Sequence, residues 1–326
     1  MEKTFNYVGI DISKLTFDVA FEANGKYVHR KFKNNEEGFA LFAIELTSSV
    51  HCCVMEASGP YYLKLAFYLT EHEIALSVVN PLVIRRFSQM RLLRSKTDKK
   101  DALTIAQYGK TEQPGLWDKT APYILEIKQM QAHSQLLHKN RSAIIRQVEA
   151  FNANPVQSIL VMQSCKDQIK AIDGQIKLIE KEMRQIVQKH HKEQYEQLKS
   201  IPGIGAKTAM ELIILSGGFT KFTSSKQLCS YVGLSPRIFE SGTSVKGRSR
   251  ICKMGMSRVR AILYVCTWSA KKSNKGCREL FDRLIDKGKP KKVALIAVAN
   301  KLLKQAFALA TNKQYYNENK PIFSCI

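Results

Sequence analysis

The sequence predicts a mixed α/β domain followed by a long helical arm and a mostly helical domain. Three observations support this order. Strand and helix patterns alternate before residue 120, residues 122–200 carry no strand signal, and the part after residue 200 begins rich in Gly, Ser and Lys and then becomes strongly helical. The 326 residues, 44% of them hydrophobic, are enough for two cores. We therefore expect units at 1–120, 121–199 and 200–326.

The first unit opens with a buried strand and a hairpin. Asn24-Gly25 separates two alternating runs, as in a two-residue hairpin turn. Further strands and helices then alternate, which predicts a mixed sheet flanked by helices. The expected strands are 5–11, 15–23, 26–32, 51–56 and 75–80, and the expected helices are 37–46 and 61–72.

The middle part has a heptad-like seam. Its apolar residues follow a 3,4,3,4,3 spacing, which predicts a long helix that packs in a coiled-coil manner and serves as a dimerisation element. An intrachain hairpin with a helix at 124–151 stays open as the alternative. The seam consists of Ile169, Ile172, Ile176, Ile179, Met183 and Ile186.

The charge points to a polyanionic partner. The net charge is +23, and residues 201–326 hold 23 Lys and Arg against 6 Asp and Glu, while the first 200 residues hold 28 against 22. Nucleic acid is the first partner to consider, and an anionic membrane surface is the second. The apolar run at 293–299 is short for a membrane span, and the N-terminus lacks a signal-peptide pattern, so we expect a cytosolic chain without a membrane partner. The eight cysteines form no C-x-x-C pair, which argues against zinc and a disulfide framework.

Four carboxylates are predicted to meet at one edge of the sheet. Asp11 and Glu56 each end a predicted strand, and Asp98 and Asp101 lie three apart at a helix start. Ligands of open α/β sheets bind at the carboxyl ends of strands. Converging carboxylates need cations between them, and Mg²⁺ suits oxygen ligands, with a two-metal site able to assist phosphoryl transfer. Taken singly, each acid is equally well explained as a cap, a surface acid or a favourable charge in a helix's first turn.

Two stretches of the last part suit phosphate binding. "IPGIGAK" places Gly203, Gly205 and Lys207 before a helix, as in a helix-hairpin-helix turn, although a plain glycine turn would look the same. "FESGTSVKGRSR", residues 239–250, mixes hydroxyls and cations without a nearby histidine. This stretch is typical of a loop that binds phosphate, or it carries a serine that acts as a nucleophile. The cations in and around it that we expect to grip phosphate are Arg237, Lys246, Arg248, Arg250 and Lys253.

These motifs, in this order, resemble the insertion-sequence transposases of the one-hundred-and-ten family over essentially the whole chain. The motifs are "GID", "MEASGPYY", "KTDKKDA", "IPGIG", "YVGLSPR" and "ESGTSVKGRSRICKMG". Ser58 and Ser235 stand where Thr is commoner in the family, and both keep the hydroxyl.

The resemblance implies a RuvC-like (RNase H-fold) DEDD domain, a coiled-coil connector and a C-terminal transposase domain. It implies a DNA recombinase guided by a bridge RNA from its own element, which pairs with donor and target DNA. By position, Asp11, Glu56, Asp98 and Asp101 would bind metal, Mg²⁺ or Mn²⁺, and Ser241 would join covalently to a DNA phosphate. It also implies composite active sites in a dimer or tetramer.

Three rival functions remain at this stage. A metal-dependent, structure-specific nuclease would keep the fold and use water in place of Ser241. An actin-like sugar kinase begins with the same strand-turn-strand pattern. Against a kinase, no second phosphate-binding motif follows in the sequence, and a sugar substrate would not explain the net charge of +23. A non-catalytic nucleic-acid-binding protein would not need the acidic cluster.

Overall fold

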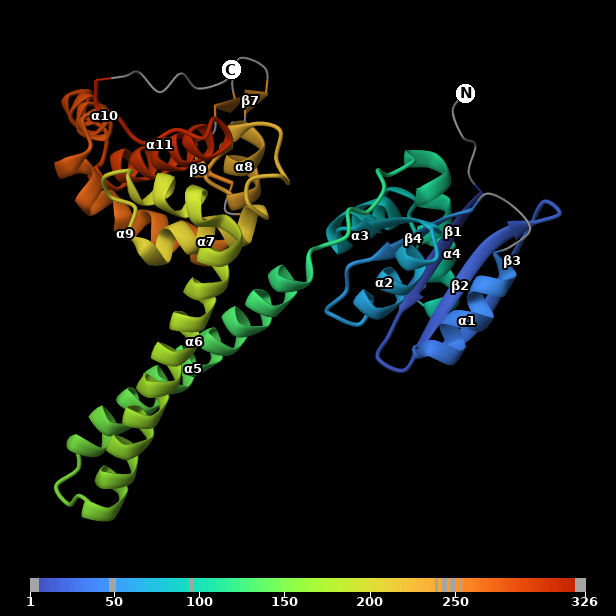
Figure 1. The fold of residues 1–326 in the computed structure, drawn as a ribbon, viewed down its shortest axis with the longest axis horizontal. Helices are drawn as coiled ribbons and strands as arrows, with labels where there is room; N and C mark the ends of the chain where they lie inside the picture. Colours follow the sequence, from blue (N-terminus) through green and yellow to red (C-terminus); the bar gives the residue numbers. More distant parts are fainter. Residues whose placement is uncertain are drawn as a thin grey trace. The chain divides into compact units, whose positions relative to one another are not determined.

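The chain folds into two compact units, each with a hydrophobic core of its own (Figure 1). The computed structural model describes residues 6–46, 51–93, 97–237, 240–241, 245–246, 250–252 and 254–319. Unit 1 spans Met1–Thr120 and unit 2 spans Ala121–Ile326.

Unit 1 is built on a five-stranded mixed sheet with strand order β3-β2-β1-β4-β5. The first three strands pair antiparallel, and β1 pairs parallel with β4, which pairs parallel with β5. The predicted mixed sheet is therefore confirmed. The strands are β1 (Asn6–Ile12), β2 (Thr16–Ala23), β3 (Lys26–Lys33), β4 (His51–Glu56) and β5 (Ala75–Val79).

The predicted hairpin turn is confirmed at Asn24-Gly25. Both residues have positive φ angles, 52° and 75°, as a type I′ turn requires. This turn fixes the register of β2 on β3 from Thr16↔Lys33 to Ala23↔Lys26. Side chains at alternate positions of both strands are thereby committed to one face or the other.

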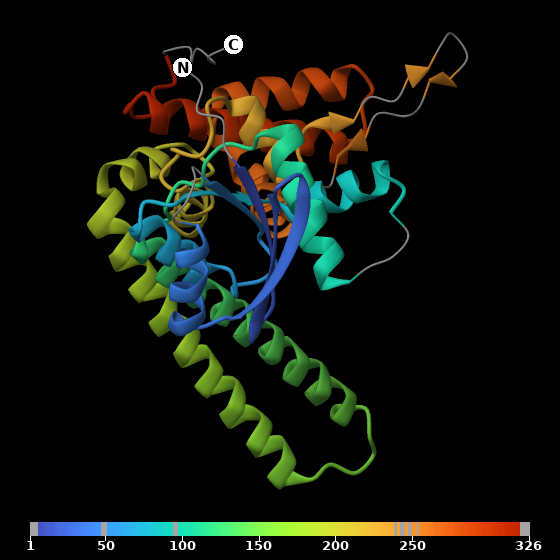
Figure 2. The ribbon, with the colours of Figure 1, turned by 90° about the vertical axis from the view of Figure 1, so that its right-hand side faces the viewer.

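Helices cover both faces of the sheet (Figure 2). Apolar side chains of α1 and α2 pack with Val8 and Ile10 of β1 in one core cluster. On the opposite face, Ile84 of α3 and Ile105 of α4 pack with Val54 of β4. The bounds are α1 (Glu36–Glu45), α2 (Leu63–Glu71), α3 (Pro81–Met90) and α4 (Asp98–Glu112).

Unit 2 begins with a helical hairpin formed by α5 (Pro122–Asn152) and α6 (Ile159–Lys199) (Figure 1). Arg141 Nε and Nη2 donate to the two carboxylate oxygens of Asp173 at 2.6 and 3.3 Å, which ties the helices together. Ile176 and Met183 of the predicted seam are buried. The seam thus packs within the chain, as the alternative interpretation of the sequence had it, and an intermolecular coiled coil is not confirmed.

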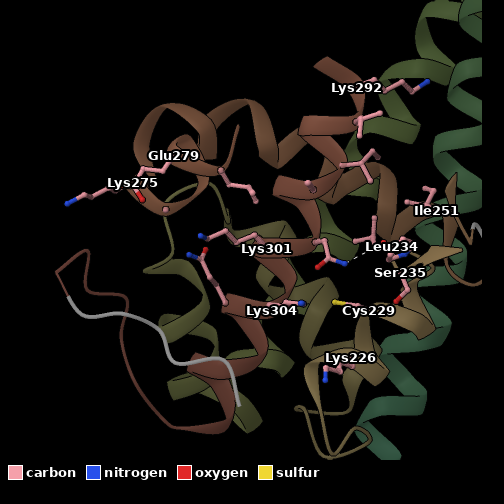
Figure 3. Close-up of a pocket in the computed structure, with 18 of the residues that line it drawn as sticks. Lys226, Cys229, Leu234, Ser235, Ile251, Lys275, Glu279, Lys292, Lys301 and Lys304 are labelled. Carbon is pink, nitrogen blue, oxygen red and sulfur yellow. Dashed lines mark hydrogen bonds between the residues drawn. The ribbon is translucent and has the colours of Figure 1, made fainter. Parts of the chain in front are cut away.

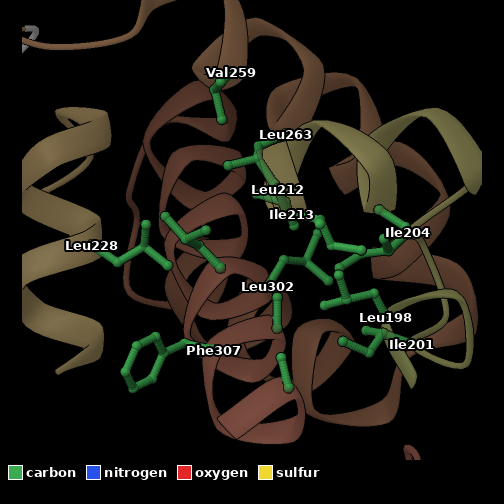
Figure 4. Packing of buried hydrophobic residues seen from close by; sticks show 14 of the residues in the cluster. Leu198, Ile201, Ile204, Leu212, Ile213, Leu228, Val259, Leu263, Leu302 and Phe307 are labelled. Atoms are coloured by element: carbon green, nitrogen blue, oxygen red, sulfur yellow. The ribbon is translucent and has the colours of Figure 1, made fainter. Parts of the chain in front are cut away.

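The rest of unit 2 packs around one apolar helix (Figure 4). Leu302 and Phe307 of this helix, α11, meet Leu263 of α9 and Leu228 of α8 in the core. Four two-residue strands make two small pairs, β6 with β9 and β7 with β8. The elements are α7 (Ala206–Ser216), α8 (Ser225–Val232), β6 (Pro236–Arg237), β7 (Glu240–Ser241), β8 (Val245–Lys246), β9 (Arg250–Ile251), α9 (Ser257–Ser273), α10 (Lys275–Asp286) and α11 (Lys291–Thr311).

By length and composition, α11 is the one helix among the described residues that could cross a membrane. Two thirds of its apolar window is buried inside the protein, with Val298, Ala299 and Leu302 fully enclosed. Its buried side faces the core of unit 2, whereas Lys291, Lys292 and Val293 at its start are exposed. The helix therefore reads as a core element.

Candidate active site

Asp11 and Glu56 lie at the carboxyl ends of neighbouring parallel strands. The pairing of β1 with β4 runs from Asn6↔His51 to Ile10↔Met55, and one further step of that register sets Asp11 beside Glu56. Both residues are partly buried. The Ser58 hydroxyl donates a hydrogen bond of 2.5 Å to Glu56 Oε1. Ser58 therefore orients this carboxylate, a role that the sequence did not indicate.

Two glycines let α4 lie unusually close to this edge of the sheet. A Cβ on Gly9 would stand 2.1 Å from the carbonyl oxygen of Ala102, and a Cβ on Gly109 would stand 2.8 Å from Tyr7 Cδ1 and Val54 Cγ2. Contacts early in α4 are thus made late in β1, and contacts late in α4 are made early in β1. The N-terminus of α4 therefore points to the end of β1 that carries Asp11.

Asp98 and Asp101 occupy the first turn of α4. Thr97 caps the helix, since its hydroxyl accepts a hydrogen bond of 3.3 Å from the Lys100 N–H. Three residues apart, the two aspartates share the helix face that continues through Ala102. That face packs on the sheet, so both carboxylates are directed to the edge where Asp11 and Glu56 lie.

The pKa of Asp11 reflects the negative charges near it. Burial and, after it, the negative charges of Asp101, Asp98 and Glu56 together raise the pKa of Asp11 from 3.8 to about 6. A carboxylate responds in this way only when like charges are near and poorly screened. The structure therefore brings Glu56, Asp98 and Asp101 within electrostatic range of Asp11.

A fifth acid, Asp18, adds to the cluster and was missed by the sequence analysis. It stands opposite Asp11 in the β1–β2 register, is 5% exposed, and also raises the pKa of Asp11. Its own carboxylate meets His29 Nε2 at 2.7 Å and Lys31 Nζ at 3.4 Å. Side chains alternate between the two faces along β2, so the register of β2 on β1 would have been enough to place Asp18 on the same face as Asp11.

The four carboxylates are chemically suitable ligands for a hard divalent cation. Carboxylate oxygens are the ligands that Mg²⁺ and Mn²⁺ prefer, and the raised pKa of Asp11 shows a local excess of negative charge. Among the described residues, however, no three His, Cys, Asp or Glu side chains lie close enough to hold one ion as they stand. Ion binding would therefore have to draw Asp11, Glu56, Asp98 and Asp101 closer together.

The predicted nucleophile lies in a small strand pair of unit 2. Ser241 of β7 is paired with Val245 of β8, and Arg237 of β6 is paired with Arg250 of β9. Arg237 is exposed. For Ser241, Lys246 and Arg250 the structure defines the backbone pairing, whereas Arg248 and Lys253 lie outside the described residues.

The glycine turn before α7 has a packing role. Gly203 has a φ of +104°, and a Cβ there would stand 2.6 Å from the Ala270 Cβ of α9. Gly205 is the N-cap of α7 and leaves the first N–H groups without a side-chain cap. Lys207, expected to contact phosphate, forms an ion pair with Glu180 of α6. The plain glycine turn therefore explains Gly203, and a helix-hairpin-helix is not confirmed.

Comparison with known proteins gives matches over both units. A transposase model of the DEDD type matches residues 8–151, and the model of the transposase IS116/IS110/IS902 family matches residues 195–282. The pilin gene-inverting proteins of Moraxella lacunata and Moraxella bovis are each 33% identical over 98% of this chain and 99% of their own length. A transposase for insertion sequence element IS1111A from Coxiella burnetii is 21% identical over 96% of this chain and 92% of its own.

Proposed function

Because this chain belongs to the IS110 family of transposases, we propose that it cuts and rejoins DNA through a covalent bond between Ser241 and a DNA phosphate. The gathering of four carboxylates, those of Asp11, Glu56, Asp98 and Asp101, is the observation that carries the proposal. A DNA phosphate that approaches such an edge needs cations there, and the residues able to hold Mg²⁺ or Mn²⁺ are the same four. Bound ions would polarise the phosphate and stabilise the developing charge.

The reaction conserves the number of phosphodiester bonds. The Ser241 oxygen forms a bond to phosphorus, the bond from phosphorus to one sugar oxygen breaks, the serine proton is lost to a base, and the leaving sugar oxygen gains a proton. Rejoining is the reverse with a new sugar hydroxyl, so no nucleotide cofactor is required. Lys246, Arg248, Arg250 and Lys253, together with Arg237, would hold the phosphates of the strand.

The relatives' names favour rejoining over plain hydrolysis. An inversion of a gene requires that every cut end be joined again, and the Moraxella relatives are named for inverting a pilin gene. A nuclease that uses water discards the energy of the phosphodiester bond, whereas a phosphoserine keeps it. The water-dependent nuclease remains the second candidate, because the same four carboxylates would serve it.

Ser241→Ala separates the two candidates. We expect this variant to lose both strand cutting and the covalent protein–DNA adduct, measured on labelled DNA in a denaturing gel, while Ser244→Ala, three positions along the chain, keeps both. Cutting that persists in Ser241→Ala, without an adduct, would assign the chain to the nuclease class. Asp11→Ala is inactive under either candidate and so controls for the metal site.

We extend the proposal to RNA guidance and to oligomerisation in the cytosol. The family resemblance supports a bridge RNA that pairs with donor and target DNA, and the excess of cations suits both nucleic acids. Purification of the protein from cells that carry its whole element, followed by sequencing of bound RNA, tests this directly. A preparation without a discrete RNA from the element's flank would refute guidance and leave the serine chemistry standing.

Exposed apolar side chains at the tip of the α5–α6 hairpin support a homo-oligomer. Val156, Ile159 and Leu160 are 83%, 86% and 79% exposed, which is costly for a surface that faces water alone. A dimer or tetramer would let the acids of one subunit meet Ser241 of another. We expect Ile159→Glu with Leu160→Glu to lower the mass in solution, and an unchanged mass would remove the tip from the interface.

A further inference from the structure

A large groove in unit 2 is lined by lysines from three helices (Figure 3). Its volume is about 1580 Å³, which exceeds the roughly 300–1,000 Å³ of pockets for small molecules. We call it the lysine groove. Its cationic residues are Lys226 of α8, Lys275 of α10 and Lys292, Lys301 and Lys304 of α11.

The lysine groove carries an unbalanced positive charge. Five lysines line it against two acids, Glu279 and Glu318. Within the described part of the chain, none of the five ammonium groups forms an ion pair with a carboxylate. Five unpaired cations around one hollow raise the local potential and attract a polyanion.

One of these cations is in an unfavourable place unless an anion joins it. Lys301 Nζ lies 3.1 Å from the point where a Cβ of Gly276 would stand, in the first turn of α10. The N-terminus of a helix carries a partial positive charge, so an ammonium group there is repelled. A phosphate at this position would interact favourably with both Lys301 and the helix end.

Apolar residues line the lysine groove beside the cations. Val293, Ile296 and Ala297 of α11 recur on the helix face that also carries Lys301 and Lys304. Figure 3 shows Leu234 and Ile251 at one side of the groove, where Asn300 Nδ2 donates to the Leu234 carbonyl oxygen at 3.4 Å. A groove lined by both lysines and apolar side chains suits a single nucleic acid strand, which presents phosphates and also sugar and base faces.

The lysine groove begins at the base of the loop that carries Ser241. Pro236 of β6 and Ile251 of β9, the paired residues at that base, both line it. Ser241 follows Arg237 by four residues, a span of at most about 14 Å even in a fully extended chain. A strand joined to Ser241 can therefore continue into the groove.

We propose that the lysine groove holds the phosphodiester backbone of the DNA strand that continues from the phosphate attacked by Ser241. The inference rests on the proposed function of Ser241 and assigns a second binding surface to the same strand. An RNA strand has the same phosphodiester backbone, so the experiment compares binding of a DNA strand with binding of an RNA strand.

The test measures binding of a fluorescein-labelled 20-nucleotide single DNA strand, and of an RNA of the same sequence, to the full chain with Ser241→Ala. The groove variant carries Lys226→Gln, Lys275→Gln and Lys292→Gln, three exposed positions. The control variant carries Lys287→Gln, Lys289→Gln and Lys313→Gln, which are exposed and lie outside the lysine groove. Both lose the same charge.

We expect the groove variant to bind the DNA strand at least tenfold more weakly at 0.15 M salt. The slope of log affinity against log salt should fall by about 2, because each lost phosphate contact removes roughly 0.7. The control should change little. A second variant, Lys301→Gln with Lys304→Gln, tests the inner cations, and circular dichroism verifies that each variant is folded.

Equal losses in the groove and control variants would overturn the proposal, as would a loss confined to the RNA strand. Adduct formation by the wild-type serine is measured separately. If Ser241 forms the adduct while the groove variants bind DNA normally, the lysine groove is refuted and the proposed function stands. If Ser241 forms no adduct, the proposed function fails whatever the groove variants show.

Discussion

Asp11→Asn is expected to stabilise unit 1 while abolishing catalysis. Burial and the neighbouring carboxylates raise the pKa of Asp11 from 3.8 to about 6, so its charged form is disfavoured in the folded state. At one pKa unit per 1.36 kcal/mol, the ionised carboxylate costs at most about 3 kcal/mol of folding free energy at pH 7.5, because solvent screens this partly exposed group. An uncharged amide of the same shape removes most of that cost.

The pH dependence follows from the direction of the shift. The folded protein binds the proton more tightly than the unfolded chain, so the contribution of Asp11 to stability is fully present below pH 3.8 and is lost as the pH rises through about 6. The advantage of Asp11→Asn should therefore shrink about threefold, from at most about 3 kcal/mol at pH 7.5 to at most about 1 kcal/mol at pH 4.5.

The chain offers a selective probe for this measurement. Of its two tryptophans, Trp117 lies in unit 1 and packs on Phe67 with ring centroids 5.7 Å apart, while Trp268 lies in unit 2 and is 51% exposed. With Trp268→Phe as background, fluorescence during urea unfolding in EDTA reports unit 1 alone. The free energy of unfolding is then compared at several pH values.

Asp118→Asn is the matched control, because Asp118 is an exposed acid of the same unit. It removes the same charge and should leave the unfolding free energy within about 0.5 kcal/mol of wild type. A stabilisation by Asp11→Asn that is equal at pH 4.5 and 7.5, or absent at both, would refute the electrostatic account of the acidic cluster.

Three further predictions follow from packing and ion pairs. Gly9→Ala should cost unit 1 about 1–3 kcal/mol and abolish cutting, because the new Cβ meets the Ala102 carbonyl, whereas Gly115→Ala, with nothing within 4 Å, should do neither. Gly174→Ala, in open space on α6, should raise the stability of unit 2 by about 0.5–1 kcal/mol in thermal unfolding, and a decrease would mean that another chain covers that face. Arg258→Met should destabilise unit 2 by about 3–5 kcal/mol, because it leaves the buried Glu211 carboxylate without its ion-pair partner. Adding Glu211→Gln should recover much of the lost stability. If the double variant recovers none, the ion pair does not stabilise unit 2.

The sequence was sufficient for the five strands of unit 1, for α1 and α2 and for the start of α4, because their signals are local, whereas α3 was not predicted. The Asn24-Gly25 turn needs only two residues with positive φ, and the alternation of buried and exposed side chains is set within each strand. The acids Asp11 and Glu56 could be placed because a strand end is visible in the sequence and parallel strands end at the same edge.

The remaining features depend on contacts that local patterns do not encode. A 3,4 spacing fits a partner helix of the same chain as well as one of another chain, so the seam could not show that Met183 packs within the hairpin. Lys207 could not be assigned to Glu180, because the two residues lie 27 positions apart. The lysine groove likewise joins α8, α10 and α11, whose lysines look like ordinary solvated charges one by one.

In unit 1, the repulsion among the carboxylates at the edge of the sheet opposes the close packing of α4 on the sheet. The close contact of Gly9 with Ala102 holds the first turn of α4 near the carboxyl end of β1, so Asp98 and Asp101 lie near Asp11. The close packing of α4 on the sheet therefore offsets the repulsion that it creates. Divalent cations that bind between the carboxylates would relieve the same repulsion, so they should stabilise wild-type unit 1 more than Asp11→Asn. If the proposed phosphoryl transfer takes place at this edge, the like charges that would hold the metal ions also lower the stability of metal-free unit 1.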